Sequence, residues 1–242
     1  MNAGKTVALV TGANKGIGKE TVRVLAAQGW TVYLGSRDAG RGEAAKAELG
    51  LGDSDIRVIS LDVTDDASVA ATVAQVTSEA GRLDVLINNA GIGVDMDPVT
   101  DVTIDAMKRT FEVNVYGPVR LTQAMLPLMR AGDAKTIVNL SSELGSLGLH
   151  GFPDSPYDKV VPFAYNASKT ALNAFTVLLA KQLKGEGFKV NSVSPGYTAT
   201  DLNGFSGPRT VEQAAAVVAQ YAMLDRTGPT GGFFTEGGSV PW

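Results

Sequence analysis

The sequence predicts an α/β fold in which helices pack on both faces of a parallel β-sheet. Three observations lead to this fold class. Short apolar runs alternate with longer amphipathic stretches along the chain. The runs are continuous, as expected for strands covered on both faces. Glycine- or asparagine-rich turns follow several runs, at the strand ends where open parallel sheets bind ligands.

Seven apolar runs are candidates for strands. They lie at Val7–Val10, Thr31–Leu34, Ile56–Leu61, Val85–Ile87, Ile137–Leu140, Val190–Val193 and Gly232–Phe234. The amphipathic stretches between most of them fit helices that make right-handed crossovers. No Pro- or Ser-rich linker interrupts the alternation, so we expect a single doubly wound, Rossmann-type domain over residues 1–242, with about seven strands. For Val240–Trp242 the pattern suggests only a hydrophobic contact with the rest of the protein.

The composition argues against several kinds of function. No apolar run approaches the ~20 residues that span a bilayer, and the first residues show no secretory signal, so we expect a cytoplasmic protein without membrane contact. With no cysteine and one histidine, His150, the chain lacks the residues for a thiolate or multi-histidine metal site or a thiol nucleophile. A net charge of −4 without a basic cluster argues against nucleic acid as a partner.

A glycine-rich turn, Thr11–Gly18, follows the first apolar run and precedes a helical stretch. Gly12 would permit a tight turn, Gly16 would let the backbone approach a pyrophosphate, and Gly18 would let the helix pack on the strand. The phosphates would then lie at the helix N-terminus. The spacing differs from the usual Gly-x-Gly-x-x-Gly, and by itself such a turn could be only a loop.

Tyr165 and Lys169 are four residues apart, which places them on one face of a helix. A phenol normally ionises near pH ~10. A neighbouring cation favours the phenolate, so this pair is typical of a general acid/base. The same spacing also fits a half-buried tyrosine beside a lysine whose stem packs along the surface.

Other motifs follow later strand candidates in order. They are Asn88–Gly91, Asn114 within Phe111–Val115, the pair Ser141 and Ser142, and Pro195–Thr200. Together with the glycine turn, Tyr165 and Lys169, this ordered set runs from about residue 5 to about residue 238 and resembles the short-chain dehydrogenase/reductase family.

The resemblance implies an NAD(P)-dependent oxidoreductase. Tyr165 would be the acid/base, Lys169 would lower the pKa of Tyr165 and hold the cofactor ribose, and Ser142 would bond to the substrate oxygen. Asn114 would help to hold a water-linked proton relay. Ser141 is the alternative to Ser142, and each of these polar side chains could instead only satisfy nearby backbone groups.

The resemblance also implies a set of cofactor contacts. They are Gly12, Asn14, Lys15, Gly16, Ile17 and Gly18 in the glycine turn; Arg37, Asp62 and Val63 after the second and third strands; Asn89, Ala90 and Gly91 after the fourth; Tyr165 and Lys169; and Pro195, Gly196, Thr198 and Thr200. Asp62 equally fits a loop before a helix, for which Thr64 and Asp65 are the better N-cap candidates.

The end of the second strand indicates which nicotinamide cofactor is used. NAD enzymes usually carry an acid here that bonds to the ribose 2′-hydroxyl, whereas this chain has Ser36. Arg37 follows, and Lys15 supplies a second cation, so the two could hold a 2′-phosphate. We therefore expect NADP (NADPH). The alternative is that Asp38 is the ribose acid and Arg37 a surface charge.

Ser142 and Tyr165 are separated by 22 residues, more than members of the family commonly have. The extra residues form an aromatic, proline-rich insertion around 146–163 that includes His150, Phe152, Pro153, Tyr157, Pro162 and Phe163. Because loops on rigid scaffolds often carry specificity, we expect this insertion to line the substrate pocket and to favour a hydrophobic or aromatic carbonyl compound. A surface loop that packs on itself is the alternative.

The insertion and the Asn14-Lys15 dipeptide are similar to the carbonyl-reductase branch of the family. That resemblance implies NADPH-dependent reduction of ketones, aldehydes or quinones to alcohols, with Tyr165 as general acid. It also implies a monomer, because the insertion would obstruct the helices through which other members assemble. An alcohol dehydrogenase working oxidatively would use the same residues, and a Rossmann fold alone also permits a non-catalytic NADP-binding sensor.

Overall fold

The computed structural model describes residues 4–52, 54–94, 97–155, 157–160 and 162–242. Its strands form one sheet in the order β3-β2-β1-β4-β5-β6-β7-β8. The strands are β1 (Val7–Val10), β2 (Thr31–Ser36), β3 (Ile56–Ser60), β4 (Val85–Asn88), β5 (Thr136–Leu140), β6 (Lys189–Val193), β7 (Phe233–Thr235) and β8 (Gly238–Ser239). Neighbouring strands from β3 to β7 are parallel, which confirms the predicted fold class.

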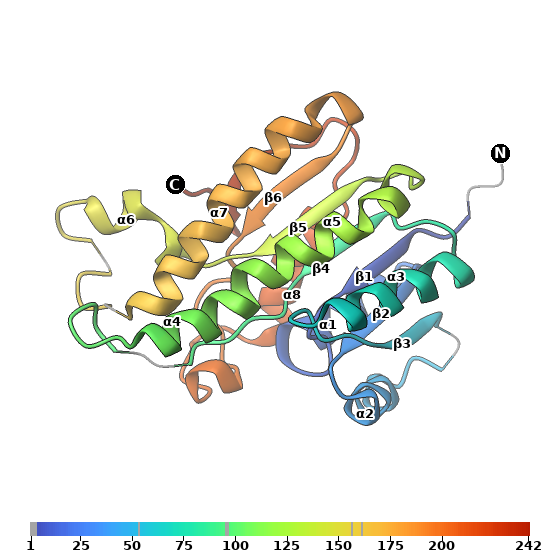
Figure 1. Cartoon of the computed structure of the whole chain (residues 1–242), viewed down its shortest axis with the longest axis horizontal. Coiled ribbons are helices and arrows are strands. Elements are labelled where there is room, and N and C mark those ends of the chain that lie inside the picture. Colours follow the sequence, from blue (N-terminus) through green and yellow to red (C-terminus); the bar gives the residue numbers. More distant parts are fainter. Residues whose placement is uncertain (1–3, 53, 95–96, 156, 161) are drawn as a thin grey trace.

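Helices cover both faces of the sheet (Figure 1). They are α1 (Gly16–Ala27), α2 (Ala39–Leu49), α3 (Asp66–Glu79), α4 (Ile104–Phe111), α5 (Gly117–Arg130), α6 (Leu147–Gly151), α7 (Phe163–Leu183) and α8 (Val211–Ala222). Shorter turns are the π-helical η1 (Glu112–Tyr116) and the 3₁₀ turns η2 (Glu143–Gly145), η3 (Lys184–Glu186) and η4 (Asp201–Asn203).

Successive residues of each central strand belong to two different hydrophobic cores. Leu9 packs in the core that contains residues of α3, α5 and α7, whereas Ala8 and Val10 pack in the core with residues of α1, α2 and α8. Side chains alternate between the two faces of a strand. Since both faces are covered, most positions of β1, β4 and β5 are apolar, and this explains the continuous apolar runs.

The last strand, β8, differs from the expected seven parallel strands. It pairs antiparallel with β7, through Phe234 with Ser239 and Thr235 with Gly238. Gly238 and Ser239 have no apolar side chain to bury, so a search for apolar runs does not detect them. No helix in the described part of the chain is both long and apolar enough to cross a membrane. The cytoplasmic location stays a prediction.

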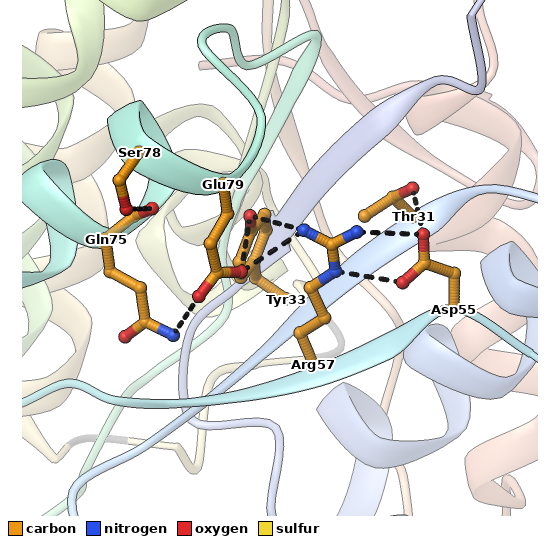
Figure 2. A network of polar contacts seen from close by, with 7 residues as sticks. All are labelled: Thr31, Tyr33, Asp55, Arg57, Gln75, Ser78 and Glu79. Atoms are coloured by element: carbon orange, nitrogen blue, oxygen red, sulfur yellow. Dashed lines mark hydrogen bonds and ion pairs between the residues drawn. The ribbon is translucent and has the colours of Figure 1, made fainter.

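A polar network joins β2, β3 and α3 near the first residues of the strands, away from their carboxyl ends (Figure 2). Arg57 donates to Asp55 (Nε–Oδ1, 2.9 Å) and to Glu79 (Nη1–Oε2, 3.2 Å). The Tyr33 hydroxyl donates to Glu79 at 3.0 Å, and Thr31 donates to Asp55 at 2.7 Å. Burial raises the pKa of Tyr33 to about 12, and the bond to Glu79 acts in the same direction. The network therefore fixes β3 at the edge of the parallel sheet.

We expect Arg57→Ala to lower the free energy of unfolding by about 1–2 kcal/mol, because Asp55 and Glu79 would lose their shared counter-charge in a partly buried place. Urea unfolding measures this difference. Arg41→Ala, at an exposed position of α2, is the matched control and should change stability by less than about 0.5 kcal/mol. Equal losses in the two variants would contradict a stabilising role for the network.

Candidate active site

The turns after β1 and β4 contact each other closely at the carboxyl edge of the sheet. Gly12 has a positive φ of 60°, and a Cβ atom there would lie 2.9 Å from the Cα atom of Ala90. The Asn89 side chain donates to the carbonyl oxygens of Thr11 (2.7 Å) and Gly12 (3.1 Å). At Gly18 a Cβ atom would lie 2.5 Å from Asn89 Nδ2. This contact therefore requires glycine at positions 12 and 18, and Asn89 supports the turn.

The start of α1 is open to an anion. Lys15 is its N-cap residue, and in the described structure no side chain caps this helix. Side chains cap α2, α3, α4 and α8 through Asp38, Asp65, Thr103 and Thr210, whereas α5 and α7, like α1, have no side-chain cap. The amide groups of a helix's first turn have no partners within the helix. The start of α1 thus fits the phosphates of a dinucleotide.

The residues after β2 bear on whether Arg37 or Asp38 would contact the cofactor ribose. The Asp38 carboxylate accepts a bond from the Arg41 amide at 2.8 Å and caps α2. Ser36 is buried and donates to the Asp38 carbonyl oxygen at 2.7 Å. Arg37 is exposed, and Lys15 forms an ion pair with Asp201. This arrangement favours Arg37 over Asp38 as the residue available to a cofactor.

Asp62 lies in a turn after β3 in which its own side chain is bonded. Its Oδ1 atom accepts from the amide (2.9 Å) and the hydroxyl (2.7 Å) of Thr64. Burial acts to raise the pKa of Asp62, but these bonds outweigh it and the pKa is lowered. Asp65 is the N-cap of α3, as predicted. Val63 packs against Gly117, because a Cβ atom at Gly117 would lie 2.7 Å from Cγ2 of Val63.

Tyr165 and Lys169 lie one turn apart on α7, as predicted. The Lys169 Nζ atom is 5.5 Å from the centroid of the Tyr165 ring. Lys169 is buried, and its Nζ donates to the carbonyl oxygen of Leu140, the last residue of β5, at 2.7 Å. The Ser142 side chain lies close enough to the Tyr165 hydroxyl to oppose the rise in its pKa. The structure therefore brings Ser142, Tyr165 and Lys169 together at the end of β5.

Burial dominates the protonation of this cluster, and the effect of Lys169 on the pKa of Tyr165 stays a prediction. Burial raises the pKa of Tyr165 to about 12, and only Ser142 opposes it. Burial lowers the pKa of Lys169 to about 8. The physical reason is that a buried phenolate and a buried ammonium group each lose hydration, so burial disfavours the charged form of both residues. At neutral pH Tyr165 is a phenol and Lys169 is mostly a cation.

The two adjacent serines have different surroundings. Ser141 is buried and donates to Asn173 Oδ1 at 2.7 Å, which uses its hydroxyl within the core. Ser142 is partly exposed, and its Oγ atom accepts from the Leu144 amide at 3.2 Å. Of the two, Ser142 is therefore the one that is placed at Tyr165.

Asn114 connects the loop after β4 with α7. It lies in η1, a π-helical turn between α4 and α5. Its amide group bonds both the N–H and the carbonyl of Ile92, each at 2.8 Å, and donates to Ser168 at 3.0 Å. A Cβ atom at Gly91 would lie 3.4 Å from Asn114 Oδ1 and 3.6 Å from Lys169 Nζ. The sequence did not predict the π-helical turn, a feature frequent at functional sites.

The segment after β6 crosses the same edge. Gly196 has a φ of 78°, and Thr198 is buried with its hydroxyl bonded to the Gly196 carbonyl at 3.1 Å. A Cβ atom at Gly196 would lie 2.6 Å from Cδ of Arg209, a residue that the sequence analysis missed. Arg209 donates to Glu236 at 2.6 Å, while its Nε and Nη2 atoms are buried without a partner in the described structure. No motif marks a single arginine of this kind.

The geometry and the comparisons agree on the class of protein. The family model described as short chain dehydrogenase matches residues 6–210. The chain therefore belongs to the short-chain dehydrogenase/reductase family, a family of oxidoreductases that use a nicotinamide cofactor.

Individual relatives agree with the predicted branch. (−)-Isopiperitenone reductase of Mentha piperita is 35% identical over 94% of this chain and 95% of its own length. (+)-Neomenthol dehydrogenase of Arabidopsis thaliana is 33% identical over 95% of each chain. The crystal structure of NADPH-bound carbonyl reductase from chicken fatty liver superposes with a TM-score of 0.85 and 26% identity, over 98% of this chain and 99% of that one. The resemblance to carbonyl reductases is thus confirmed.

Proposed function

We propose that this protein reduces ketones and aldehydes, with quinones as a further class, to alcohols with NADPH. The observation that carries the proposal is the cluster of Ser142, Tyr165 and Lys169, in which Tyr165 keeps its proton at neutral pH. A phenol that must donate a proton to a carbonyl oxygen needs this protonated form. The cluster therefore supports Tyr165 as the group that gives its proton to the carbonyl oxygen.

The cofactor fits the edge formed by the turns after β1, β4 and β6. The open start of α1 would hold the pyrophosphate, Lys15 and Arg37 the 2′-phosphate, and Lys169 the nicotinamide ribose. The remaining contacts would come from the segments that begin at Asn89 and Pro195. When bound, NADPH would supply a hydride from nicotinamide C4 to the carbonyl carbon.

The protein's own groups would act on the carbonyl oxygen. The Ser142 hydroxyl would donate a hydrogen bond as negative charge develops there. Tyr165 would transfer its proton to that oxygen, which completes the alcohol, and the phenolate left behind would be stabilised by the Lys169 cation. Tyr165 would regain a proton from solvent along the relay that Lys169 and Asn114 help to hold.

The surface around this cluster favours a lipophilic substrate. Eight of the twelve exposed large apolar side chains of the described structure lie in three segments near the site, residues 97–104, 146–163 and 197–205. They are Val99, Ile104, Leu147, Phe152, Phe163, Tyr197, Leu202 and Phe205. These segments follow β4, β5 and β6, and open parallel sheets bind ligands beyond the carboxyl ends of their strands. The substrates that name isopiperitenone reductase and neomenthol dehydrogenase support this choice.

We expect Tyr165→Phe to lower kcat by about 10²–10⁴-fold with little change in the Kd for NADPH, because the phenol acts on the transition state more than on cofactor binding. NADPH consumption at 340 nm and a fluorescence titration measure the two constants. Turnover retained by this variant would refute the assignment. A wild-type protein that binds NADPH but reduces no carbonyl of a broad panel would favour the sensor alternative.

The cofactor preference is tested by removing the two cations. Lys15→Ala and Arg37→Ala should each raise the KM for NADPH by about tenfold and leave the KM for NADH nearly unchanged, because only NADPH carries the 2′-phosphate. The control is Lys46→Ala, on α2, for which both constants should stay as in wild type. An equal rise in the KM for NADPH and for NADH would contradict the assignment of Lys15 and Arg37 to the 2′-phosphate.

The pKa of Lys169 predicts how the rate depends on pH. With a pKa of about 8 for Lys169 and about 12 for Tyr165, Lys169 loses its charge first as the pH rises. The phenolate formed during turnover then loses its stabilising cation, so kcat for reduction should be constant at neutral pH and fall above about pH 8. Initial rates at saturating NADPH between pH 6 and 10 measure this. A rate that still rises through pH 9 would contradict it.

We also propose that the protein is a monomer. The insertion lies at the N-terminal end of α7 (Figure 1), where Pro162 bridges to Pro98 and the Phe163 amide donates to the Asp97 carbonyl. It would thus obstruct helix pairing along α7. Light scattering should give a mass near 25.1 kDa, and a mass of twice or four times this value would overturn the proposal.

A further inference from the structure

The segment Val240–Trp242 is attached to the insertion by specific contacts. After β8, the Val240 amide donates to the Phe233 carbonyl at 2.8 Å and continues the pairing with β7. The Trp242 ring then stacks on the buried Phe233 ring, with centroids 5.6 Å apart and planes inclined by 22°. These contacts fix the segment on the sheet before it reaches α6.

Ser146 and Gly148 are the partners on the side of the insertion. Ser146 is fully buried, and its hydroxyl donates to the Pro241 carbonyl at 2.6 Å while it accepts from the Leu149 amide at 3.0 Å as the N-cap of α6. The Gly148 amide donates to the Trp242 carbonyl at 2.7 Å. A Cβ atom at Gly148 would lie 3.0 Å from Pro241 Cβ and from that carbonyl oxygen. The backbone of α6 is therefore held directly against Pro241 and Trp242.

The same helix is connected to the catalytic cluster. Gly145, one residue before Ser146, lies so close to α7 that a Cβ atom there would be 2.6 Å from Lys169 Cβ. His150 Nε2 donates to the Leu144 carbonyl at 3.0 Å. The insertion is thus fixed on one side at Lys169 and on the other at Pro241 and Trp242.

The rest of the insertion contacts this fixed part. The ring centroid of Tyr157 lies 5.8 Å from that of His150. Burial and the neighbouring Glu143, the residue after Ser142, raise the pKa of Tyr157. Leu147 and Phe152, at the two ends of α6, are 68% and 56% exposed. A shift of α6 would therefore move exposed apolar side chains of the segment that follows Ser142.

We propose that Pro241 and Trp242 are positioning residues that hold α6, through Ser146 and Gly148, and thereby set how well the active site accepts bulky carbonyl substrates. This inference rests on the proposed function, because it concerns selectivity among carbonyl substrates. A bulky ketone reaches the surface of α6, whereas a small ketone contacts only the catalytic cluster.

The test compares Trp242→Ala with Trp242→Phe, Gly148→Ala and the control Met223→Ala, which removes an exposed apolar side chain after α8. With cyclohexyl phenyl ketone, Trp242→Ala and Gly148→Ala should raise the KM roughly three- to tenfold. The KM for 2,3-butanedione, the Kd for NADPH and the constants of Met223→Ala should stay unchanged. Trp242→Phe keeps a stacked ring, so its KM for cyclohexyl phenyl ketone should be close to that of wild type.

Hydrogen exchange gives a readout that does not need turnover. The Gly148 amide should exchange at least about tenfold faster in Trp242→Ala than in wild type or Met223→Ala. Unchanged exchange at Gly148, or equal changes in KM for the two ketones, would overturn the inference. A wild-type protein that reduces neither ketone would refute the proposed function, and the exchange at Gly148 would then still decide whether Trp242 positions α6.

Discussion

The buried ammonium group of Lys169 is the constraint around which the carboxyl edge of the sheet is built. Burying a charge without a partner is costly, and here the last carbonyl of β5, that of Leu140, accepts a bond from Nζ at 2.7 Å. Gly145 must lack a side chain because its backbone passes next to this lysine, and a Cβ atom at Gly91 would be in van der Waals contact with Nζ. The turns after β4 and β5 and the helix α7 therefore meet at one side chain, and their meeting point is where Ser142 and Tyr165 lie.

The helix that faces α7 carries a related adaptation. The π-helical turn η1 interrupts the continuous helix from Ile104 to Arg130 at Asn114. The Asn114 side chain bonds to the backbone of Ile92 and to the Ser168 hydroxyl. That hydroxyl in turn donates to the Tyr165 carbonyl at 2.7 Å. The position of Tyr165 thus depends on two strand-end turns and on one irregular turn of a neighbouring helix.

The sequence predicted the parts that follow from short patterns. Apolar runs located β1 to β7, the glycine turn located the start of α1, and the order of motifs located Ser142, Tyr165 and Lys169. It did not predict β8, because Gly238 and Ser239 bury no apolar side chain. The sequence also did not predict the π-helical turn, the contact of Arg209 with Gly196 or the raised pKa of Tyr165. Each of these features depends on packing between segments that are distant in the chain.

The ion pair between Lys15 and Asp201 has a consequence for how a charged ligand enters. Asp201 lies in η4, in the segment that follows β6, and both side chains are about half exposed or more. A phosphate that reaches Lys15 must take the place of a carboxylate, so the exchange swaps one anion for another and leaves the lysine neutralised throughout. Salt weakens both ion pairs, and its effects on them partly cancel. The contribution of Lys15 to the affinity would then depend less on ionic strength than that of Arg37. In the described structure Arg37 forms no ion pair within 4.0 Å, although its charge acts on Asp62.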